Sequence, residues 1–130
     1  MSVLSVRDLR VTYRTRGGAV PAVRGVSFDI GRGEVLGMAG ESGCGKSTIV
    51  NAAMRLLPAD TEVTGQVLLD GEDVLAMKPG RLRAVRWAGA SVIFQGSLQS
   101  LNPVRTICDP IEEAMLVHGA TDVEGDPTHR

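Results

Sequence analysis

The chain has 130 residues, a hydrophobic fraction of 43% and a formal net charge of −1. This length suits one domain with a hydrophobic core, and the near-zero charge gives no sign of a nucleic-acid partner. Cys44 and Cys108 lie far apart without other ligands at metal spacing, which argues against a zinc site or disulfide framework and indicates a reducing compartment. No apolar run approaches the roughly 20 residues of a membrane span, so a membrane role would require a partner chain.

Two antiparallel strands are predicted at the start of the chain. Apolar and polar residues alternate over residues 4–13, with a slip at Arg7-Asp8 that predicts a β-bulge. Gly17-Gly18 predicts a turn, and the alternation resumes over residues 22–30 before a second turn at residues 31–33. This segment is typical of an antiparallel β hairpin.

A strand, a glycine-rich turn and a helix are predicted next. Residues 34–39 are a nearly continuous apolar run, which predicts a strand buried on both faces, as in a parallel sheet under helices. A helix is predicted over residues 46–57, where apolar residues recur at helical spacing and Pro58 stops the pattern.

The elements predicted after this helix are short. Residues 64–75 predict a hairpin around Asp70-Gly71, and residues 79–86 a helix with Leu82 and Val85 on one side and a solvated face of arginines. Residues 91–94 predict a strand, and residues 96–103 a polar loop. A last helix is predicted from Asp109 as N-cap to a stop at Gly119, and residues 119–130 show no periodicity.

The turn at residues 40–47 fits the phosphate-binding pattern G-x-x-x-x-G-K-[ST] at every fixed position. Its glycines permit backbone conformations in which successive N–H groups point at phosphate oxygens. The helix that follows adds its unpaired N–H groups and the positive end of its dipole. Lys46 is expected to reach the β and γ phosphates of a nucleotide, and the Ser47 hydroxyl to take one Mg²⁺ position.

Lys46 is informative because Lys46 and Lys78 are the two lysines of a chain whose other cationic residues are arginines. Its presence indicates that this position requires a compact ammonium group, because a planar guanidinium would not fit equally well. The alternative is a glycine-rich turn without a ligand, against which the flanking strand and helix argue. Cys44 is interpreted as a small filler, and the alternative is a redox sensor, whose thiolate would repel phosphate.

Several stretches of the sequence are similar to one protein family. They are LRVTY at 9–13, AVRGVSF at 22–28, GEVLG at 33–37, GESGCGKST at 40–48, VIFQ at 92–95 and SLNP at 100–103. The sequence resembles the ATPase subunits of ABC transporters, particularly those of oligopeptide, dipeptide and nickel importers. The resemblance spans residues 4 to about 119.

The resemblance implies ATP and Mg²⁺ as cofactors. Tyr13 matches the aromatic residue that stacks on adenine, and Val23 is expected to line the same site; the alternatives are an outward-facing strand Tyr and a core Val. Gln95 matches the glutamine that contacts Mg²⁺ and the attacking water, although Gly96-Ser97 replaces the Asp-Pro that normally follows. The remaining nucleotide-binding residues are expected to be Gly40, Glu41, Ser42, Gly43, Cys44, Gly45, Lys46, Ser47 and Thr48, with Ser47 and Gln95 at the metal.

By the same resemblance, residues 1–130 are the N-terminal part of one α/β, P-loop NTPase-like nucleotide-binding domain with an antiparallel β subdomain. Residues 1 to about 105 are expected to form a β-rich core with the P-loop, and about 106–130 the start of a helical subdomain with a disordered tail. The family's signature segment, its strand ending in Asp-Glu and its switch His are absent from the sequence. We therefore expect the chain to bind ATP and to hydrolyse little of it alone.

The predicted function is the ATP-binding part of a subunit that energises uptake of peptides or a related small solute. The expected partners are a second ATPase subunit and membrane permease subunits, contacted through residues 95–103, which would place the chain on the cytoplasmic face of the cell membrane. One alternative is a small P-loop kinase, against which the antiparallel segment before the loop argues. The other is a non-catalytic module that docks to a permease. His118 and His129 are interpreted as helix-end and tail residues.

Overall fold

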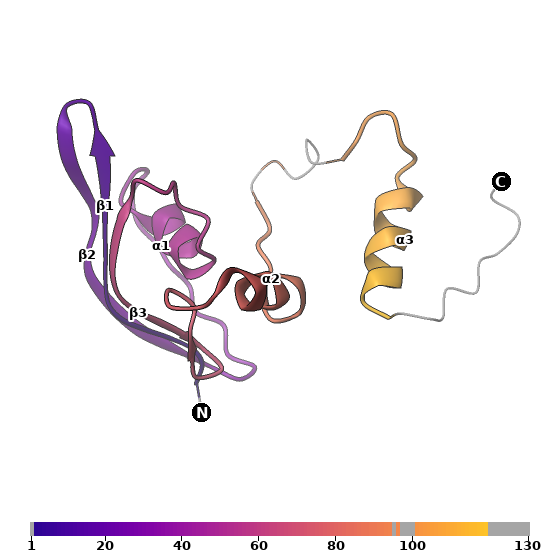
Figure 1. Cartoon of the computed structure of the whole chain (residues 1–130), viewed down its shortest axis with the longest axis horizontal. Helices are drawn as coiled ribbons and strands as arrows, with labels where there is room; N and C mark the ends of the chain where they lie inside the picture. Colours follow the sequence, from indigo (N-terminus) through magenta and orange to yellow (C-terminus); the bar gives the residue numbers. More distant parts are fainter. Residues whose placement is uncertain (1, 95, 97–100, 120–130) are drawn as a thin grey trace, which may run out of the picture. The chain divides into compact units, whose positions relative to one another are not determined.

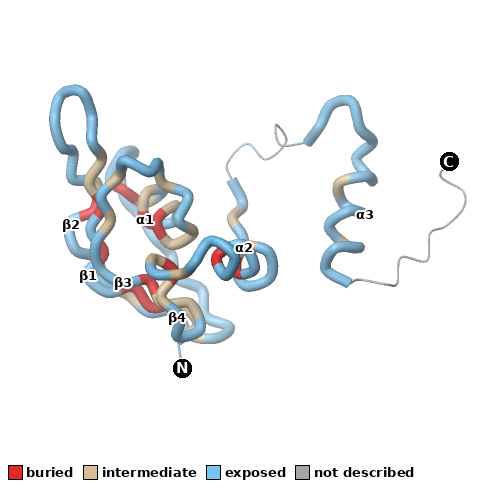
Figure 2. Tube along the Cα trace, in the orientation of Figure 1, coloured by how far each residue is buried: buried red, intermediate tan, exposed pale blue. Residues whose placement is uncertain are grey.

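The computed structural model describes residues 2–94, 96 and 101–119 of a chain that divides into two compact units, Met1–Arg86 and Trp87–Arg130. The first unit holds strands β1 (Ser2–Thr15), β2 (Gly18–Gly31) and β3 (Glu62–Leu69) and helix α1 (Lys46–Ala53) (Figure 1). It also holds the short strand β4 (Glu72–Asp73) (Figure 2). Helix α2 (Pro79–Ala88) runs from the first unit into the second, which holds helix α3 (Cys108–Val117). In these described ranges no helix is long and apolar enough to cross a membrane. The domain division expected near residue 105 remains a prediction.

The four strands form one antiparallel sheet in the order β2-β1-β3-β4. The β1–β2 hairpin closes at the predicted glycine turn, where Thr15 pairs with Gly18. The β3–β4 hairpin turns at Asp70 and Gly71, whose φ angles of 46° and 84° suit a two-residue turn with positive φ at both positions. Both predicted hairpins are therefore confirmed.

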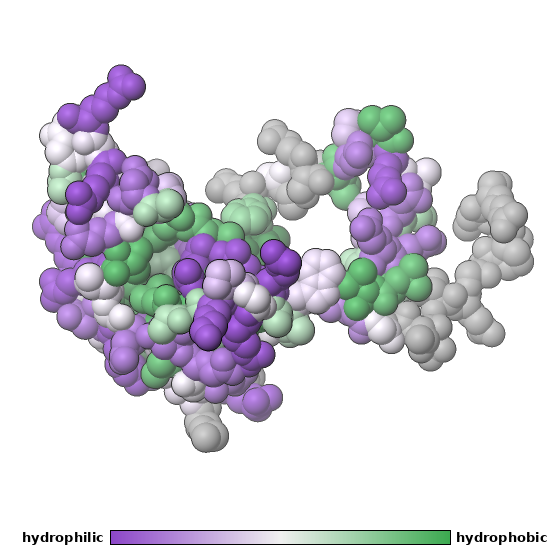
Figure 3. All heavy atoms as spheres, in the orientation of Figure 1, coloured by the Kyte–Doolittle hydropathy of each residue, from purple (hydrophilic) through white to green (hydrophobic). Residues whose placement is uncertain are grey.

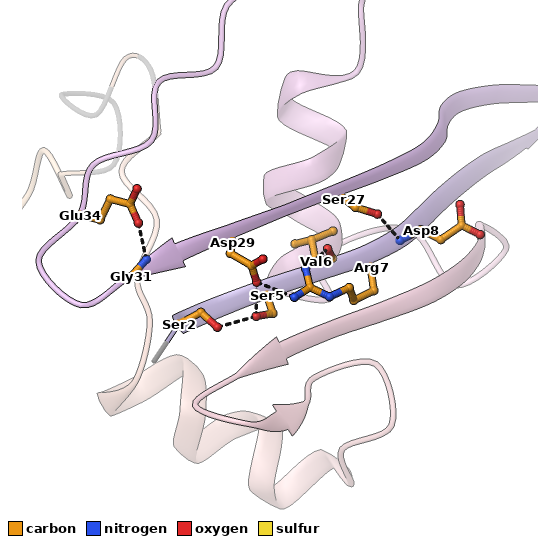
Figure 4. Close-up of polar contacts among 9 residues, drawn as sticks. All are labelled: Ser2, Ser5, Val6, Arg7, Asp8, Ser27, Asp29, Gly31 and Glu34. Atoms are coloured by element: carbon orange, nitrogen blue, oxygen red, sulfur yellow. Dashed lines mark hydrogen bonds and ion pairs between the residues drawn. The ribbon is translucent and has the colours of Figure 1, made fainter.

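A β-bulge interrupts β1 at the predicted position. The register with β2 shifts between Val6 and Leu9, and Asp8 has a φ of 42°. The Asp8 backbone N–H donates to the Ser27 hydroxyl at 2.8 Å (Figure 4). Because the extra residue resets the alternation, Val6 and Leu9 both face the core and are fully buried.

Polar side chains join β1 to β2 beside this bulge. The Asp29 carboxylate accepts hydrogen bonds from the Ser5 hydroxyl at 2.5 Å and from the Arg7 guanidinium at 2.8 Å (Figure 4). The Arg7 contact, followed by the Ser5 contact, lowers the pKa of the Asp29 carboxyl. Ser5 is buried, and this bond provides the partner that a buried hydroxyl requires.

The core of the first unit lies between the sheet and the helices that pack on it. Figure 2 shows its buried residues on the strands, α1 and α2. They are Val6, Leu9, Val11, Val23, Ile49, Ala52, Val67, Val74 and Leu82, of which Val74 lies in the turn after β4. The predicted apolar side of α2 is confirmed, because Leu82 and Val85 are both buried.

Helix α1 ends at Ala53, so the predicted end at residue 57 is wrong. Arg55 adopts a left-handed conformation with a φ of 51°. The Leu56 N–H donates to the Asn51 carbonyl at 2.8 Å, and the Arg55 N–H donates to the Ala52 carbonyl at 3.0 Å. This pair of bonds closes the helix in a Schellman motif, here without the usual glycine.

The arginines of α2 are not all on a solvated face, so this prediction is wrong for Arg86. Its Nε donates to the Met54 carbonyl at 2.9 Å, and its Nη2 donates to the Arg55 carbonyl at 2.5 Å. Arg86 therefore supplies positive charge and hydrogen bonds to the C-terminal end of α1, where carbonyls lack helical partners. Arg81 instead forms an ion pair with Glu72.

The strands predicted at residues 34–39 and 91–94 are absent, so these two predictions are wrong. Both segments lack strand pairing, and their apolar side chains are exposed: 93% for Val35 and 92% for Ile93. A parallel strand needs a neighbour to bond its backbone groups and a helix layer to cover it. Within the described residues neither segment has a neighbouring strand. Figure 3 shows hydrophobic atoms at the surface of the first unit.

Helix α3 begins one residue before the predicted N-cap. Ile107 is the N-cap, and Asp109 lies in the first turn, so the prediction of Asp109 as N-cap is wrong. The predicted stop is confirmed, because Gly119 has a φ of 73° and its N–H donates to the Leu116 carbonyl at 3.2 Å. None of the α3 side chains is buried.

We predict that Gly65→Ala destabilises the first unit far more than Gly71→Ala. Gly65 faces the bulge with a φ of 98°, and an added Cβ would lie 2.5 Å from the Asp8 carbonyl oxygen. Gly71 also has positive φ, at 84°, but has open space around it. We expect a loss of about 3 kcal/mol for Gly65→Ala and about 1 kcal/mol for Gly71→Ala, measured by urea unfolding. Equal losses would show that the bulge can shift to accept the methyl group.

Candidate functional site

The glycine loop lies between residue 39 and α1 and meets the start of the helix. Gly45 is the N-cap of α1, with φ 96° and ψ 3°, and the Ile49 N–H donates to its carbonyl at 3.0 Å. Within α1, which the structure describes in full, no side chain caps the N-terminus and the first turn has no acidic residue. The first N–H groups and the positive end of the helix dipole therefore face the loop, as anion binding requires.

The loop also lies against strand β2, because Gly45 lacks a side chain. A Cβ at Gly45 would lie 2.6 Å from the Ala22 carbonyl oxygen and 3.5 Å from the Val23 side chain. With its φ of 96°, this position requires glycine on two separate grounds. The residue is buried, whereas residues 40–44 and Ser47 are exposed. The contact with β2 thus fixes the position of Gly45, while the other residues of the loop stay accessible to solvent.

The Lys46 ammonium lies inside the loop. Its Nζ donates to the Gly40 carbonyl at 2.6 Å and to the Glu41 carbonyl at 2.7 Å. It also donates to the Cys44 sulfur at 3.2 Å. A compact ammonium with three donors can make these contacts within one narrow turn. This agrees with the prediction that this position requires a lysine and not an arginine.

These features fit a nucleotide phosphate. The loop combines uncapped helical N–H groups with a lysine ammonium, and both favour a phosphate oxygen. Phosphate oxygens would replace the loop carbonyls as acceptors for Lys46. Ser47 is exposed on the first turn of α1, where its hydroxyl could serve as a Mg²⁺ ligand.

Two of the other predicted nucleotide-binding residues lie beside the loop. The Tyr13 hydroxyl is 3.1 Å from the Thr48 hydroxyl, which joins β1 to the first turn of α1. Val23 packs against Gly45 and is 4% exposed, as a core residue would be. Their roles at adenine remain predictions. Gln95 lies outside the described residues, as does His129.

The structure adds one contact of the loop that the sequence analysis missed. The Ala22 carbonyl fixes the position of Gly45, although Ala22 carries no functional side chain. No residue-type signal could identify it, because the contact is made by the backbone.

His118, predicted to lie at a helix end, is the C-cap of α3 and stacks on Trp87 with ring centroids 5.7 Å apart. Both residues belong to the second unit. This places His118 in a structural contact.

The loop, α1 and the antiparallel sheet together define a P-loop nucleotide-binding fold. The family model described as "ABC transporter" matches residues 23–124. The chain therefore belongs to the ABC transporter family, and the resemblance seen in its sequence is confirmed.

Relatives of known name match most of this chain. The dipeptide transport ATP-binding protein DppD of Bacillus subtilis is 45% identical over 118 residues, which are 89% of this chain and 35% of that protein. The peptidoglycan transport ATP-binding protein YejF of Agrobacterium fabrum is 44% identical over 120 residues, 91% of this chain and 22% of that protein. The oligopeptide transport ATP-binding protein OppD of Escherichia coli is 38% identical over 117 residues, 90% of this chain and 35% of that protein. The chain thus spans about a third or less of the length of these relatives.

A solved structure confirms the fold class. The dimeric structure of a bacterial ABC transporter cassette matches 87% of this chain and 47% of that chain, with a TM-score of 0.72 and 24% identity. The predicted α/β nucleotide-binding domain with an antiparallel β subdomain is therefore confirmed as the fold.

We predict that Lys46 makes Cys44 reactive at lower pH. The Lys46 hydrogen bond lowers the pKa of the Cys44 thiol, because the ammonium stabilises the thiolate. In a Cys108→Ser background, the rate of alkylation of Cys44 by iodoacetamide should therefore rise at lower pH than in the same chain carrying Lys46→Met. The pH dependence of this rate is the measurement.

Two controls separate this contact from general effects of charge. Lys78→Met in the same background should leave the pH profile unchanged, because Lys78 is an exposed residue outside the loop. In concentrated urea, which unfolds the chain, the pH profiles of alkylation should be the same for the parent and for both lysine variants. Identical profiles for Lys46→Met and the parent in the folded chain would contradict the contact.

Proposed function

We propose that this chain is the ATP-binding part of an ABC transporter ATPase that energises uptake of peptides or a related small solute. The observation that carries the proposal is the Lys46 ammonium inside a glycine loop at the uncapped start of α1. The names of the relatives, which refer to dipeptide, oligopeptide and peptidoglycan transport, support the solute class.

The loop residues would hold the phosphates in this function. Residues 40–45 and the first turn of α1 would donate N–H groups to phosphate oxygens, and Lys46 would move from the loop carbonyls to the β and γ phosphates. Ser47 and Gln95 would hold Mg²⁺, which supplies charge neutralisation between phosphates when bound. Gln95 would also orient the attacking water.

Tyr13 would supply the adenine contact, with Val23 beside it. The hydroxyl contact with Thr48 holds the Tyr13 side chain next to the helix that begins at the loop. Tyr13 is partly buried, and an aromatic ring that keeps some exposed surface could stack on a base. In this arrangement the antiparallel sheet binds the base and the loop binds the phosphates.

Permease subunits and a second ATPase subunit are the proposed partners. The described part of the proposed docking segment, residues 96 and 101–103, is exposed. The Asn102 side-chain carbonyl accepts the Val104 N–H at 3.0 Å, and the Arg105 N–H donates to the Asn102 backbone carbonyl at 3.1 Å. This turn presents Leu101 and Pro103 at the surface, where a permease could contact them. Such docking would hold the chain at the cytoplasmic face of the membrane.

We predict that Lys46→Ala weakens ATP binding while Lys78→Ala does not. Lys46 would make charge-assisted bonds to phosphate, each worth about 1.5–3 kcal/mol, so the Kd should rise at least about tenfold. Lys78 carries the same charge at an exposed position outside the loop and is the matched control. Binding of a fluorescent ATP analogue to the full chain, with and without Mg²⁺, is the measurement. The proposal fails if both variants bind the ATP analogue as tightly as the parent does. Transfer of phosphate from ATP to a small acceptor would instead favour the alternative of a P-loop kinase.

We further predict that Tyr13→Phe and Tyr13→Ala differ in adenine-nucleotide affinity. Phe loses the Thr48 hydrogen bond but keeps the aromatic face, so its Kd should stay within about twofold of the parent. Ala loses the stacking surface, and its Kd should rise about tenfold, for a stacking energy of roughly 1–3 kcal/mol. If Phe and Ala weaken binding equally, the hydroxyl matters and the stacking role is wrong.

A further inference from the structure

A hollow of about 440 Å³ lies beside the C-terminal end of α1, at the end of the helix opposite the glycine loop. Its volume is within the range of small-molecule sites, roughly 300–1,000 Å³. All of its lining residues belong to the first unit. The residues relevant to its chemistry are Ala52, Arg55, Leu57, Thr61, Val63 and Leu75.

Thr61 lines this hollow and carries a buried hydroxyl that has no hydrogen-bond partner in the part of the chain that the structure describes. Among the described residues, its Oγ1 is the buried side-chain oxygen without a hydrogen-bond partner. The Thr61 backbone is fixed, because its N–H donates to the Pro58 carbonyl at 3.0 Å. Because the hydroxyl has no partner in the described ranges, a turn of χ1 toward the hollow would break no hydrogen bond. A ligand oxygen in the hollow would then remove the cost of the unpaired buried hydroxyl.

Arg55 sets the charge of the hollow. Its Nη1 donates to the Met77 carbonyl at 2.6 Å and contacts the Val74 carbonyl at 3.5 Å. Nε and Nη2 have no acceptor within the described part of the chain, so they remain able to bind a ligand oxygen. Arg55 is the one charged residue of the lining. The hollow therefore favours an anion and offers no carboxylate to an ammonium group.

The apolar residues that line the hollow determine which non-polar group of a ligand fits it. Leu57, Val63 and Leu75 are partly buried and pack against the core. Such walls favour a short, branched aliphatic group over a polar one. We propose that the hollow beside α1 binds a small aliphatic carboxylate, with the carboxylate paired to Arg55 and hydrogen-bonded to the Thr61 hydroxyl.

The test is an NMR titration of the ¹⁵N-labelled full chain with isovalerate. Isovalerate should shift the amide signals of residues 52–63 with a Kd on the order of 1 mM, as for a very small ligand. Isovaleramide has the same shape without the charge and should bind about tenfold more weakly. Leucine adds an ammonium group that the lining does not match, and it should also bind more weakly.

Thr61→Val is the decisive variant, because it keeps the shape and removes the hydroxyl. It should weaken isovalerate binding about tenfold. It should also raise the midpoint of thermal unfolding by about 4 to 8 °C, because the unsatisfied hydroxyl is gone. Thr64→Val replaces an exposed threonine of β3 and should change neither quantity. Arg55→Lys keeps the positive charge but lacks the planar guanidinium. It should therefore reduce the difference in Kd between isovalerate and isovaleramide.

The possible results are distinct. Saturable shifts that weaken in Thr61→Val, together with the rise in unfolding temperature, support the site. Absent shifts, or equal affinity in Thr61→Val, would overturn it even if the variant is more stable. A lower unfolding temperature for Thr61→Val would show that the hydroxyl has a partner, which removes the basis of the proposal. Leucine binding at least as tightly as isovalerate would contradict the charge assignment.

Discussion

The close approach of Gly45 to the Ala22 carbonyl is the constraint on which the candidate site depends. Only a residue without a side chain can bring the start of α1 this near to β2, and the left-handed φ of Gly45 adds a second requirement for glycine. The contact holds the phosphate loop against the antiparallel sheet. It also brings the helix to β1, where Tyr13 meets Thr48. The residues of the candidate site on the sheet and on the loop are therefore held next to one another.

Charged groups and hydrogen bonds at both ends of α1 interact with the unpaired backbone groups of the helix. At the N-terminus the uncapped N–H groups and the Lys46 ammonium make the loop attractive to phosphate. At the C-terminus the left-handed Arg55 closes the helix, and the Arg86 guanidinium binds the last carbonyls. An eight-residue helix is too short to be stable alone, so these contacts and its packing on the sheet hold it in place.

Local signals predicted the antiparallel part of the fold well. The bulge at Arg7-Asp8 and the Asp70-Gly71 turn are encoded by short patterns, and both occur where predicted. The strands at residues 34–39 and 91–94 were predicted wrongly, because an apolar run indicates burial only if a neighbouring strand and a covering layer are present. The end of α1 was also missed, since nothing local distinguishes Arg55 from another helical arginine.

The sequence by itself determined which residues form the candidate phosphate-binding loop. The spacing of Gly40, Gly45, Lys46 and Ser47 predicts a phosphate-binding loop, because few other residues allow that backbone or supply that ammonium. Tertiary structure alone decided what surrounds the loop. The Ala22 carbonyl, the Tyr13–Thr48 contact and the Arg86 cap join segments distant in sequence. Such contacts depend on how strands and helices pack, which no local pattern of residues records.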